Sequence, residues 1–156
     1  MNCIIIDDEP MAIKVIESYC ESIDSITVLG SFASALEAMD FLRDHSVDLI
    51  FSDIEMHHIN GIDFMRSLER NRPIFIFTTA YPQYALEGFE LNAIDYLVKP
   101  IPFPRFIKAI QRVKQQLKLI ESNKEINTPD NVKKVELADD FVFIKSEFDN
   151  IKILIN

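Results

Sequence analysis

The sequence predicts an α/β domain in which a parallel sheet carries helices on both faces. Through the first 120 of the chain's 156 residues, short apolar runs alternate with segments whose apolar residues recur at helical spacing. Several of the apolar runs are continuous, as expected for parallel strands that are buried on both faces. Five such strand–helix units can be counted, which favours one doubly wound domain.

Each expected strand is a short apolar run that ends in polar residues. The expected strands are Cys3–Ile6, Ile26–Phe32, Leu49–Ser52, Ile74–Thr78 and Ile94–Val98. The expected helices are Pro10–Cys20, Ala35–Asp44, Gly61–Arg70, Tyr84–Leu91 and Pro104–Ile120. Two helix starts carry their own signals, because Pro10 suits a first helical turn and Ser34 followed by Glu37 matches a capping box.

The helical pattern stops after residue 120. Residues 121–131 are polar and are expected to form a linker. Three short apolar segments follow, at Val132–Leu137, Phe141–Ser146 and Ile151–Ile155. Since so few short strands make at most an incomplete sheet, we expect the chain to be a truncated form of a longer protein.

The composition indicates a cytoplasmic globular protein without a membrane partner. The chain is 48% hydrophobic and 26% charged, and no apolar run approaches the roughly 20 residues that span a bilayer. Its start lacks the basic flank and cleavage site of a secretory signal. Cys3 and Cys20 each lie in an apolar pattern, so we expect reduced core residues rather than a disulfide or a metal site.

The charge is strongly acidic but unevenly distributed. A formal net charge of −9 disfavours non-specific binding of nucleic acid by the chain as a whole. The segment Ile101–Ile120 is the exception, because it has no Asp or Glu and five basic residues: Arg105, Lys108, Arg112, Lys114 and Lys118. A solvated helix face and a specific interface would both explain this segment.

Polar residues follow the expected strands at the edge where parallel sheets bind their ligands. Asp7 and Asp8 follow the first strand, Asp53 the third, Thr79 the fourth and Lys99 the fifth. Three carboxylates at one sheet edge repel one another unless a cation offsets their charge. Mg²⁺ suits such a sparse cluster, because it takes one or two carboxylates and leaves room for phosphate oxygens.

This set of residues suggests phosphoryl transfer. Asp53 is the expected nucleophile, because a carboxylate can attack a phosphoryl group and form an aspartyl phosphate when nearby cations offset the charge. Asp8, helped by Asp7, would hold the metal, and Lys99 and Thr79 would contact the phosphoryl oxygens. Before phosphorylation we expect Asp53 and Asp8 to compete for the Lys99 ammonium group.

Four motifs in order resemble the receiver domain of bacterial two-component response regulators. They are Asp7-Asp8-Glu9-Pro10, Asp53-Ile54-Glu55-Met56 with Asn60-Gly61, Thr79-Ala80, and Tyr96-Leu97-Val98-Lys99-Pro100. The resemblance implies a flavodoxin-like five-stranded sheet of order 2-1-3-4-5 and a cis Lys99–Pro100 bond. It also implies phosphoryl transfer from a sensor histidine kinase to Asp53.

The same resemblance implies further roles. The metal ligands would be Asp8, Asp53, Asp7 through a water molecule, and the backbone carbonyl of Glu55. Thr79 and Tyr96 would move together on phosphorylation. From this movement we expect the face of the fourth helix, fifth strand and fifth helix (Ala85–Leu91, Ile94–Val98 and Arg105–Lys118) to change shape and mediate homodimerisation. Such a chain catalyses only its own phosphorylation and dephosphorylation, so it is not counted as an enzyme.

A shorter resemblance concerns the LytTR-type subgroup of regulators. The similar segments are Thr79-Ala80-Tyr81, Tyr84-Ala85-Leu86, Asn92-Ala93-Ile94-Asp95-Tyr96, and the tail strands at Phe141–Ser146 and Ile151–Ile153. This resemblance implies a receiver at 1–120, a linker at 121–131 and, at 132–156, the start of a truncated DNA-binding domain that would regulate transcription. DNA would be bound only through the missing part, because residues 132–156 carry four Lys and five acidic residues.

One position departs from the receiver pattern. His57 stands where receivers commonly have Pro, and it restores a backbone N–H and a freer φ, so we expect a more mobile loop beside the metal. His57 and His58 together could instead form a metal-binding or pH-sensitive pair.

Two other functions remain open from the sequence. A Mg²⁺-dependent aspartate-nucleophile phosphatase would normally have a second Asp at the position of Glu55. A pseudo-receiver would act as a binding module without phosphorylation and would have a broken acidic cluster.

Overall fold

The computed structural model describes residues 1–68, 72–87, 92–126, 141–145 and 150–154. The chain divides into two compact units, Met1–Lys118 and Leu119–Asn156, and each is described by itself. The first unit contains the sheet and the predicted site. The second contains the end of the last helix and a two-stranded hairpin.

A parallel sheet of five strands forms the centre of the first unit, in the order β2-β1-β3-β4-β5. The strands are β1 (Asn2–Ile6), β2 (Thr27–Phe32), β3 (Leu49–Asp53), β4 (Ile74–Thr79) and β5 (Asp95–Val98). Each strand agrees with its predicted range to within one residue at either end. The predicted flavodoxin-like fold and strand order are therefore confirmed.

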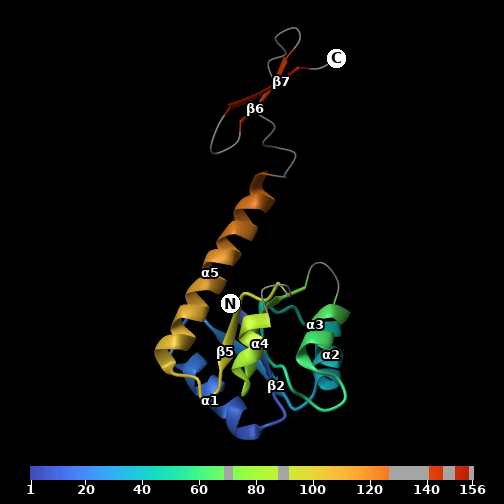
Figure 1. Ribbon diagram of the computed structural model, residues 1–156, viewed down its shortest axis with the longest axis vertical. Helices are drawn as coiled ribbons and strands as arrows, with labels where there is room; N and C mark the ends of the chain where they lie inside the picture. The colour runs from blue at the N-terminus through green and yellow to red at the C-terminus, as the bar shows by residue number, and fades with distance from the viewer. Residues whose placement is uncertain (69–71, 88–91, 127–140, 146–149, 155–156) are drawn as a thin grey trace. The chain divides into compact units, whose positions relative to one another are not determined.

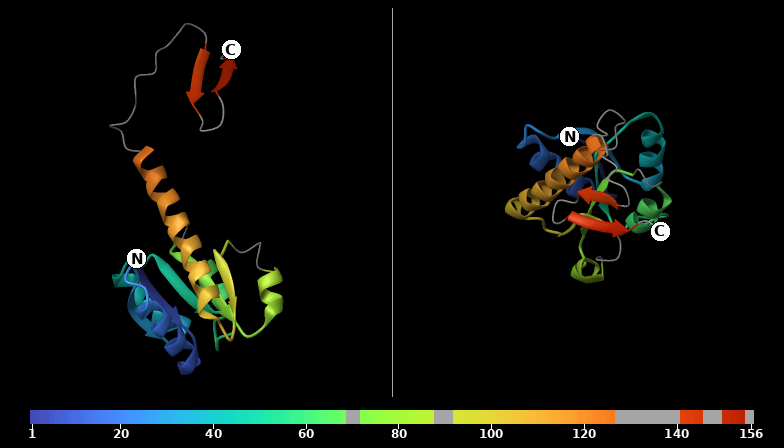
Figure 2. Two further views of the ribbon diagram at one scale, coloured as in Figure 1. Left: turned by 90° about the vertical axis from the view of Figure 1, so that its left-hand side faces the viewer. Right: turned by 90° about the horizontal axis from the view of Figure 1, so that it is seen from above.

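Helices cover both faces of this sheet. They are α1 (Pro10–Glu21), α2 (Ala35–Asp44), α3 (Gly61–Ser67), α4 (Pro82–Glu87) and α5 (Phe103–Ile126). α1 and α5 lie on one face and α2 and α3 on the other (Figure 1), and the turned view has α1 and α5 together in front of the sheet (Figure 2). Two apolar clusters result, one with Phe51 packed on Phe106 and one with Phe64 packed on Phe75.

The two predicted helix starts are confirmed. Pro10 is the first residue of α1, where its missing N–H has no partner to lose. Ser34 caps α2 by accepting a hydrogen bond from the Glu37 N–H at 3.3 Å. The Glu37 carboxylate accepts in return from the Ala33 N–H at 3.3 Å, one residue before the position in a standard capping box.

Several helix ends differ from the prediction. α4 begins at Pro82 rather than Tyr84, since Pro again suits the first turn. α3 ends at Ser67, and its expected end at Arg70 lies outside the described residues, as does Leu91 of the expected fourth helix. α5 continues to Ile126 because residues 121–126, although mostly polar, contain no Gly or Pro to end a helix.

The tail segments are described only in part. β6 (Phe141–Lys145) and β7 (Asn150–Leu154) pair as an antiparallel hairpin, within one residue of the two predicted segments. The expected segment Val132–Leu137 lies outside the described residues. Among the helices that are described, none combines the length and the apolar character needed to cross a bilayer.

An ion-pair cluster fastens α5 to β5. Asp95 is buried, and Arg105 approaches both of its carboxylate oxygens at 2.9 and 2.6 Å while Arg112 lies 3.0 Å away. Burial alone would raise the pKa of Asp95, but Arg105, the Tyr96 N–H and Arg112 together outweigh burial and lower it. Two basic residues of the Ile101–Ile120 segment therefore pair within the domain itself.

The backbone at Gly61 lies against the strand end that carries Asp53. A Cβ atom at Gly61 would collide with the Asp53 carbonyl oxygen and lie 2.8 Å from Ser52 Oγ. The Gly61 N–H also donates to the Ile54 carbonyl at 2.9 Å. Only Gly fits this close approach, and it brings the start of α3 directly beneath the Asp53 backbone.

We expect Gly61→Ala to lower the free energy of unfolding by about 2 kcal/mol, because the strand end must shift to admit the methyl group. The matched control is Gly30→Ala, whose Cβ would meet the partly exposed Phe32 ring at 2.8 Å. That ring can turn away, so the control should cost less than about 1 kcal/mol. Urea denaturation of both variants makes the comparison, and equal losses would contradict the packing argument.

Candidate functional site

The parallel sheet brings four predicted site residues to one edge. β1 pairs with β3 in register, with Ile6 opposite Ser52, so the residues that follow these strands lie side by side. Asp7, Asp8 and Asp53 each offer an oxygen within 4.8 Å of the others. Lys99, from the end of β5, lies 2.8 Å from Asp7 Oδ2 and 3.5 Å from Asp53 Oδ1.

The Asp7 and Asp53 side chains are buried at the sheet edge. Asp7 and Asp53 are only 1% and 4% exposed. Burial, followed by the negative charge of Asp7, raises the pKa of Asp53 to about 7. Burial also raises the pKa of Asp7. Burial alone would lower the pKa of Lys99, but its contacts with Asp7 and Asp53 raise it, so the ammonium stays charged.

The Lys99 ammonium group contacts Asp7, Asp53 and Glu9, and not Asp8 as expected. Beyond Asp7 and Asp53 it lies 3.4 Å from Glu9 Oε1. Asp8, expected to compete for Lys99, has its Oδ2 atom 2.8 Å from Nδ1 of His57. The sequence contained a signal for Glu9, which is the third acid in the run that begins at Asp7, but none for the loop conformation that brings His57 to Asp8.

The acidic cluster fits a hard divalent cation. Within the described residues, the Lys99 ammonium group is shared by Asp7, Glu9 and Asp53, and Asp8 adds a further carboxylate to the cluster, which leaves an excess of negative charge. Asp7 Oδ2 is buried and close to Lys99, yet it receives no well-oriented hydrogen bond within the described part of the chain. Carboxylate oxygens are the ligands Mg²⁺ prefers, so Asp7, Asp8 and Asp53 could hold that ion.

The two histidines do not add to this group of ligands. Within the described ranges, the candidate metal-binding side chains that converge are the three aspartates, and neither His57 nor His58 joins them. His58 follows His57 in a turn and has a left-handed backbone with φ of 69°. The alternative of a metal-binding histidine pair is therefore not supported.

Thr79 and Tyr96 lie on neighbouring strands beside the cluster. Thr79 is buried, and its Oγ1 accepts a hydrogen bond from the Tyr81 N–H at 3.0 Å and lies 3.5 Å from the Tyr81 carbonyl oxygen. The Tyr96 ring packs on Phe77 with centroids 5.5 Å apart, and burial raises its pKa. In this structure the Thr79 hydroxyl thus holds the chain that leads into α4.

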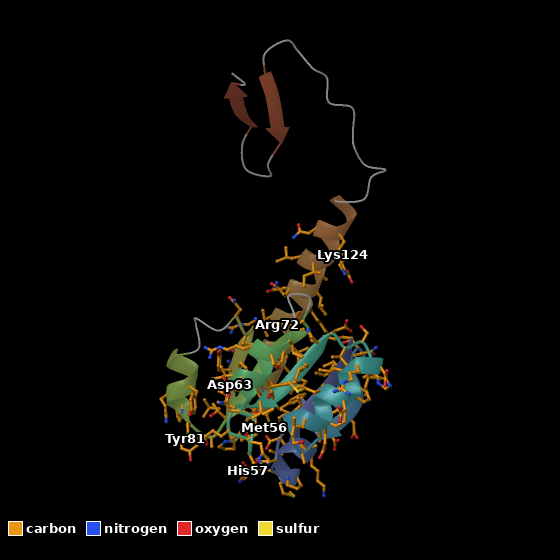
Figure 3. The ribbon with its side chains drawn as sticks, turned by 90° about the vertical axis from the view of Figure 1, so that its right-hand side faces the viewer. Met56, His57, Asp63, Arg72, Tyr81 and Lys124 are labelled. Atoms are coloured by element: carbon orange, nitrogen blue, oxygen red, sulfur yellow. The ribbon has the colours of Figure 1, made fainter. Side chains whose placement is uncertain are left out.

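A cleft opens beside the cluster, between the loop after β3 and α4. It has a volume of about 490 Å³ and is lined by Asp8, Ile54, Glu55, Met56, His57, Asn60, Ile62 and Tyr84. The Tyr84 hydroxyl donates to Glu55 Oε1 at 3.3 Å across it. Met56, His57 and Tyr81 lie at this end of the domain, and Arg72, which precedes β4, lies towards the other end (Figure 3). The cleft gives access to the edge that carries Asp8.

Comparison with known proteins supports the same interpretation. Residues 3–111 match the family model of the response regulator receiver domain. The transcriptional regulatory protein BtsR of Salmonella typhi is 35% identical over 117 residues, which cover 74% of this chain and 49% of that protein. The sensory transduction protein LytT of Bacillus anthracis is 30% identical over 133 residues, covering 83% of this chain and 54% of that protein.

The chain thus spans about half the length of the curated relatives it matches. Among solved structures, the response regulatory domain of protein mrkE from Klebsiella pneumoniae superposes with a TM-score of 0.70 at 30% sequence identity. That match covers 76% of this chain and 99% of the other. With the sheet order, the strand-end residues and the family match in agreement, the chain belongs to the response regulator receiver family.

Proposed function

We propose that Asp53 accepts a phosphoryl group from a sensor histidine kinase in a reaction that depends on Mg²⁺. The observation that carries this proposal is the convergence of Asp53 with Asp7, Asp8 and Lys99 at one sheet edge. Asp8 and Asp53 would hold the ion directly, with Asp7 through water and Glu55 through its backbone carbonyl. The bound ion would offset the charge of the carboxylates and of the phosphoryl oxygens.

In the reaction, a carboxylate oxygen of Asp53 attacks phosphorus as the bond from phosphorus to the donor nitrogen breaks. Asp53 must be ionised to attack. Its raised pKa of about 7 opposes ionisation, and the positive charge of a bound Mg²⁺ would favour it. The Lys99 ammonium is already within 3.5 Å of Asp53 and stabilises the phosphoryl oxygens. Because the chain modifies only itself, it is not counted as an enzyme.

The proposed switch begins at Thr79. Phosphorylation replaces the Asp53 carboxylate by a group that carries roughly −1.5 to −2 charge, which draws Lys99 and the Thr79 hydroxyl towards the phosphoryl oxygens. Thr79 then releases the backbone of Tyr81, which it holds at 3.0 Å, and Tyr96 turns into the space left behind. The face of α4, β5 and α5 changes shape and forms a homodimer through a shift in population between two states.

The proposed output is control of transcription from the cytoplasm. In this proposal residues 1–120 are the receiver, 121–131 the linker and 132–156 the start of a truncated LytTR-type DNA-binding domain. The similarity to LytT, whose name is that of a sensory transduction protein, and the β6–β7 hairpin support this assignment. Since α5 reaches Ile126, the first part of the proposed linker is helical. DNA would be contacted by the missing part of that domain.

The two alternatives are less well supported. A phosphatase needs a general acid two residues after the nucleophile, but Glu55 there is hydrogen-bonded to Tyr84. A pseudo-receiver would lack part of the acidic cluster, whereas Asp7, Asp8 and Asp53 all converge.

Incubation with acetyl phosphate and Mg²⁺ should add one hydroxylamine-labile phosphate to the wild-type chain and none to Asp53→Asn, as measured by intact-protein mass spectrometry. The reason is that an acyl phosphate forms only on a nucleophilic carboxylate. Repeated turnover of the donor without a stoichiometric adduct would favour the phosphatase, and an unmodified wild-type chain would favour the pseudo-receiver.

The raised pKa of Asp53 predicts a pH-dependent gain in stability for Asp53→Asn. Below the unfolded pKa of about 4 the carboxyl group is neutral in both states, so the two proteins should unfold alike. Between about pH 4 and pH 7 this carboxyl group ionises in the unfolded chain but stays protonated in the folded wild type, so the wild type loses stability that the variant keeps. The variant should therefore be more stable by on the order of 2 kcal/mol at pH 8, with the difference levelling off above pH 7.

Urea denaturation without Mg²⁺ at a series of pH values measures this difference. Adding Mg²⁺ at pH 8 should stabilise the wild type more than Asp53→Asn. A difference that is constant with pH would contradict the assigned burial and repulsion at Asp53.

Thr79→Ala should uncouple phosphorylation from dimerisation, because it removes the hydroxyl that moves from Tyr81 to the phosphoryl group. At an equal degree of phosphorylation, sedimentation should find less dimer for Thr79→Ala than for the wild type, while Thr79→Ser retains the response. If Asp53→Asn still dimerises with the phosphodonor as strongly as the wild type, the proposed coupling is wrong.

A further inference from the structure

His57 connects the loop after β3 to the end of β1. Its Nδ1 atom lies 2.8 Å from Asp8 Oδ2. A carboxylate oxygen can only accept a hydrogen bond, so Nδ1 carries the proton and donates. The His57 side chain is 88% exposed, while that of Asp8 is 24% exposed. The interaction therefore approaches the acidic cluster from the solvent side.

His57 lies where it can hydrogen-bond to a metal-binding carboxylate, Asp8, but it is not grouped with the candidate metal ligands themselves. Three aspartates share the 4.8 Å cluster, and His57 reaches only one of them, Asp8, by a hydrogen bond. Side chains that hydrogen-bond to a ligating group fix its orientation, and their loss typically weakens metal binding by 10- to 100-fold. Mg²⁺ is especially sensitive to such orientation, because it demands near-octahedral geometry.

The loop around His57 is folded to make this contact. The His57 carbonyl accepts a hydrogen bond from the Ile59 N–H at 2.9 Å, and His58 adopts a φ of 69°. On the other side of His57, Met56 is buried in the apolar cluster. The loop is thus held by Met56 in the core and by His57 on Asp8. A Pro at position 57 could fix φ but could not donate to Asp8.

We propose that His57 is a positioning residue for the cation site: by donating to Asp8 it orients that carboxylate and holds the loop after β3 over the site, and so strengthens Mg²⁺ binding. The inference rests on the proposed function, because it concerns the ion that the phosphorylation site would use. The loop after β3 was expected to be mobile, but the His57 side chain links it to Asp8, which lies just after β1.

The test is the Mg²⁺ dissociation constant of the full chain without phosphodonor, measured by calorimetric titration at one pH. His57→Ala should weaken Mg²⁺ binding by about tenfold. His57→Asn should restore most of the affinity, since the Asn amide N–H₂ occupies nearly the position of Nδ1. The matched control is His58→Asn, which changes the adjacent histidine, tolerates the left-handed backbone and should bind as the wild type does.

Two results would overturn the inference while leaving the proposed function intact. One is that His57→Ala binds Mg²⁺ as tightly as the wild type, and the other is that His57→Asn is as weak as His57→Ala. A wild-type chain that binds no Mg²⁺ would overturn both the inference and the metal-dependent function. The melting temperature of the metal-free His57→Ala chain should match the wild type, and a parallel fall would indicate a merely structural role.

Discussion

The repulsion between buried carboxylates at the edge of β1 and β3 is the constraint on which the rest of the site depends. Asp7 and Asp53 are both almost fully buried, and one ammonium group, from Lys99, serves both of them. Such a cluster is unfavourable in isolation, because each ionised carboxyl group raises the cost of ionising the next. A proton, a divalent cation or a redistribution of Lys99 relieves the repulsion, so the site responds strongly to a change in local charge.

The fold holds this cluster together through rigid elements. Parallel pairing sets Asp7 beside Asp53, and the missing side chain of Gly61 lets α3 start against the Asp53 backbone. The backbone of Lys99 is fixed to the end of β4, because the Lys99 backbone N–H donates to the Thr79 carbonyl at 2.8 Å. Repulsion alone would spread the carboxylates apart, but the strand ends are tied to apolar layers on both faces of the sheet. The apolar core therefore balances an electrostatic cost that the acidic edge cannot offset itself.

The sequence predicted the strands and the convergent residues well because both depend on a simple pattern. Continuous apolar runs that end in polar residues specify where buried parallel strands stop, and the topology then brings Asp7, Asp53 and Lys99 together. The contact of His57 with Asp8 was not predictable, since it depends on loop dihedral angles that no periodicity encodes. The contact of Glu9 with Lys99 was missed although Glu9 continues the acidic run that begins at Asp7. α5 reaches into the expected linker for another reason: polar composition is typical of a linker, but residues 121–126 contain no Gly or Pro to end a helix.

In the proposed mechanism, the signal from the acidic cluster is carried by a change of hydrogen-bond partners near α4. It does not require a large motion of the sheet. In the described state the Thr79 hydroxyl is occupied by the backbone of Tyr81, and Glu55 is occupied by the Tyr84 hydroxyl. Both contacts join residues next to the acidic cluster to the chain at the start of α4. The Thr79 hydroxyl accepts from the Tyr81 N–H at 3.0 Å and donates only a long hydrogen bond, 3.5 Å, to the Tyr81 carbonyl, so in the proposed mechanism a phosphoryl oxygen competes with that carbonyl for the hydroxyl proton. The start of α4 can therefore shift when one of these contacts is withdrawn, while the five-stranded sheet stays in register.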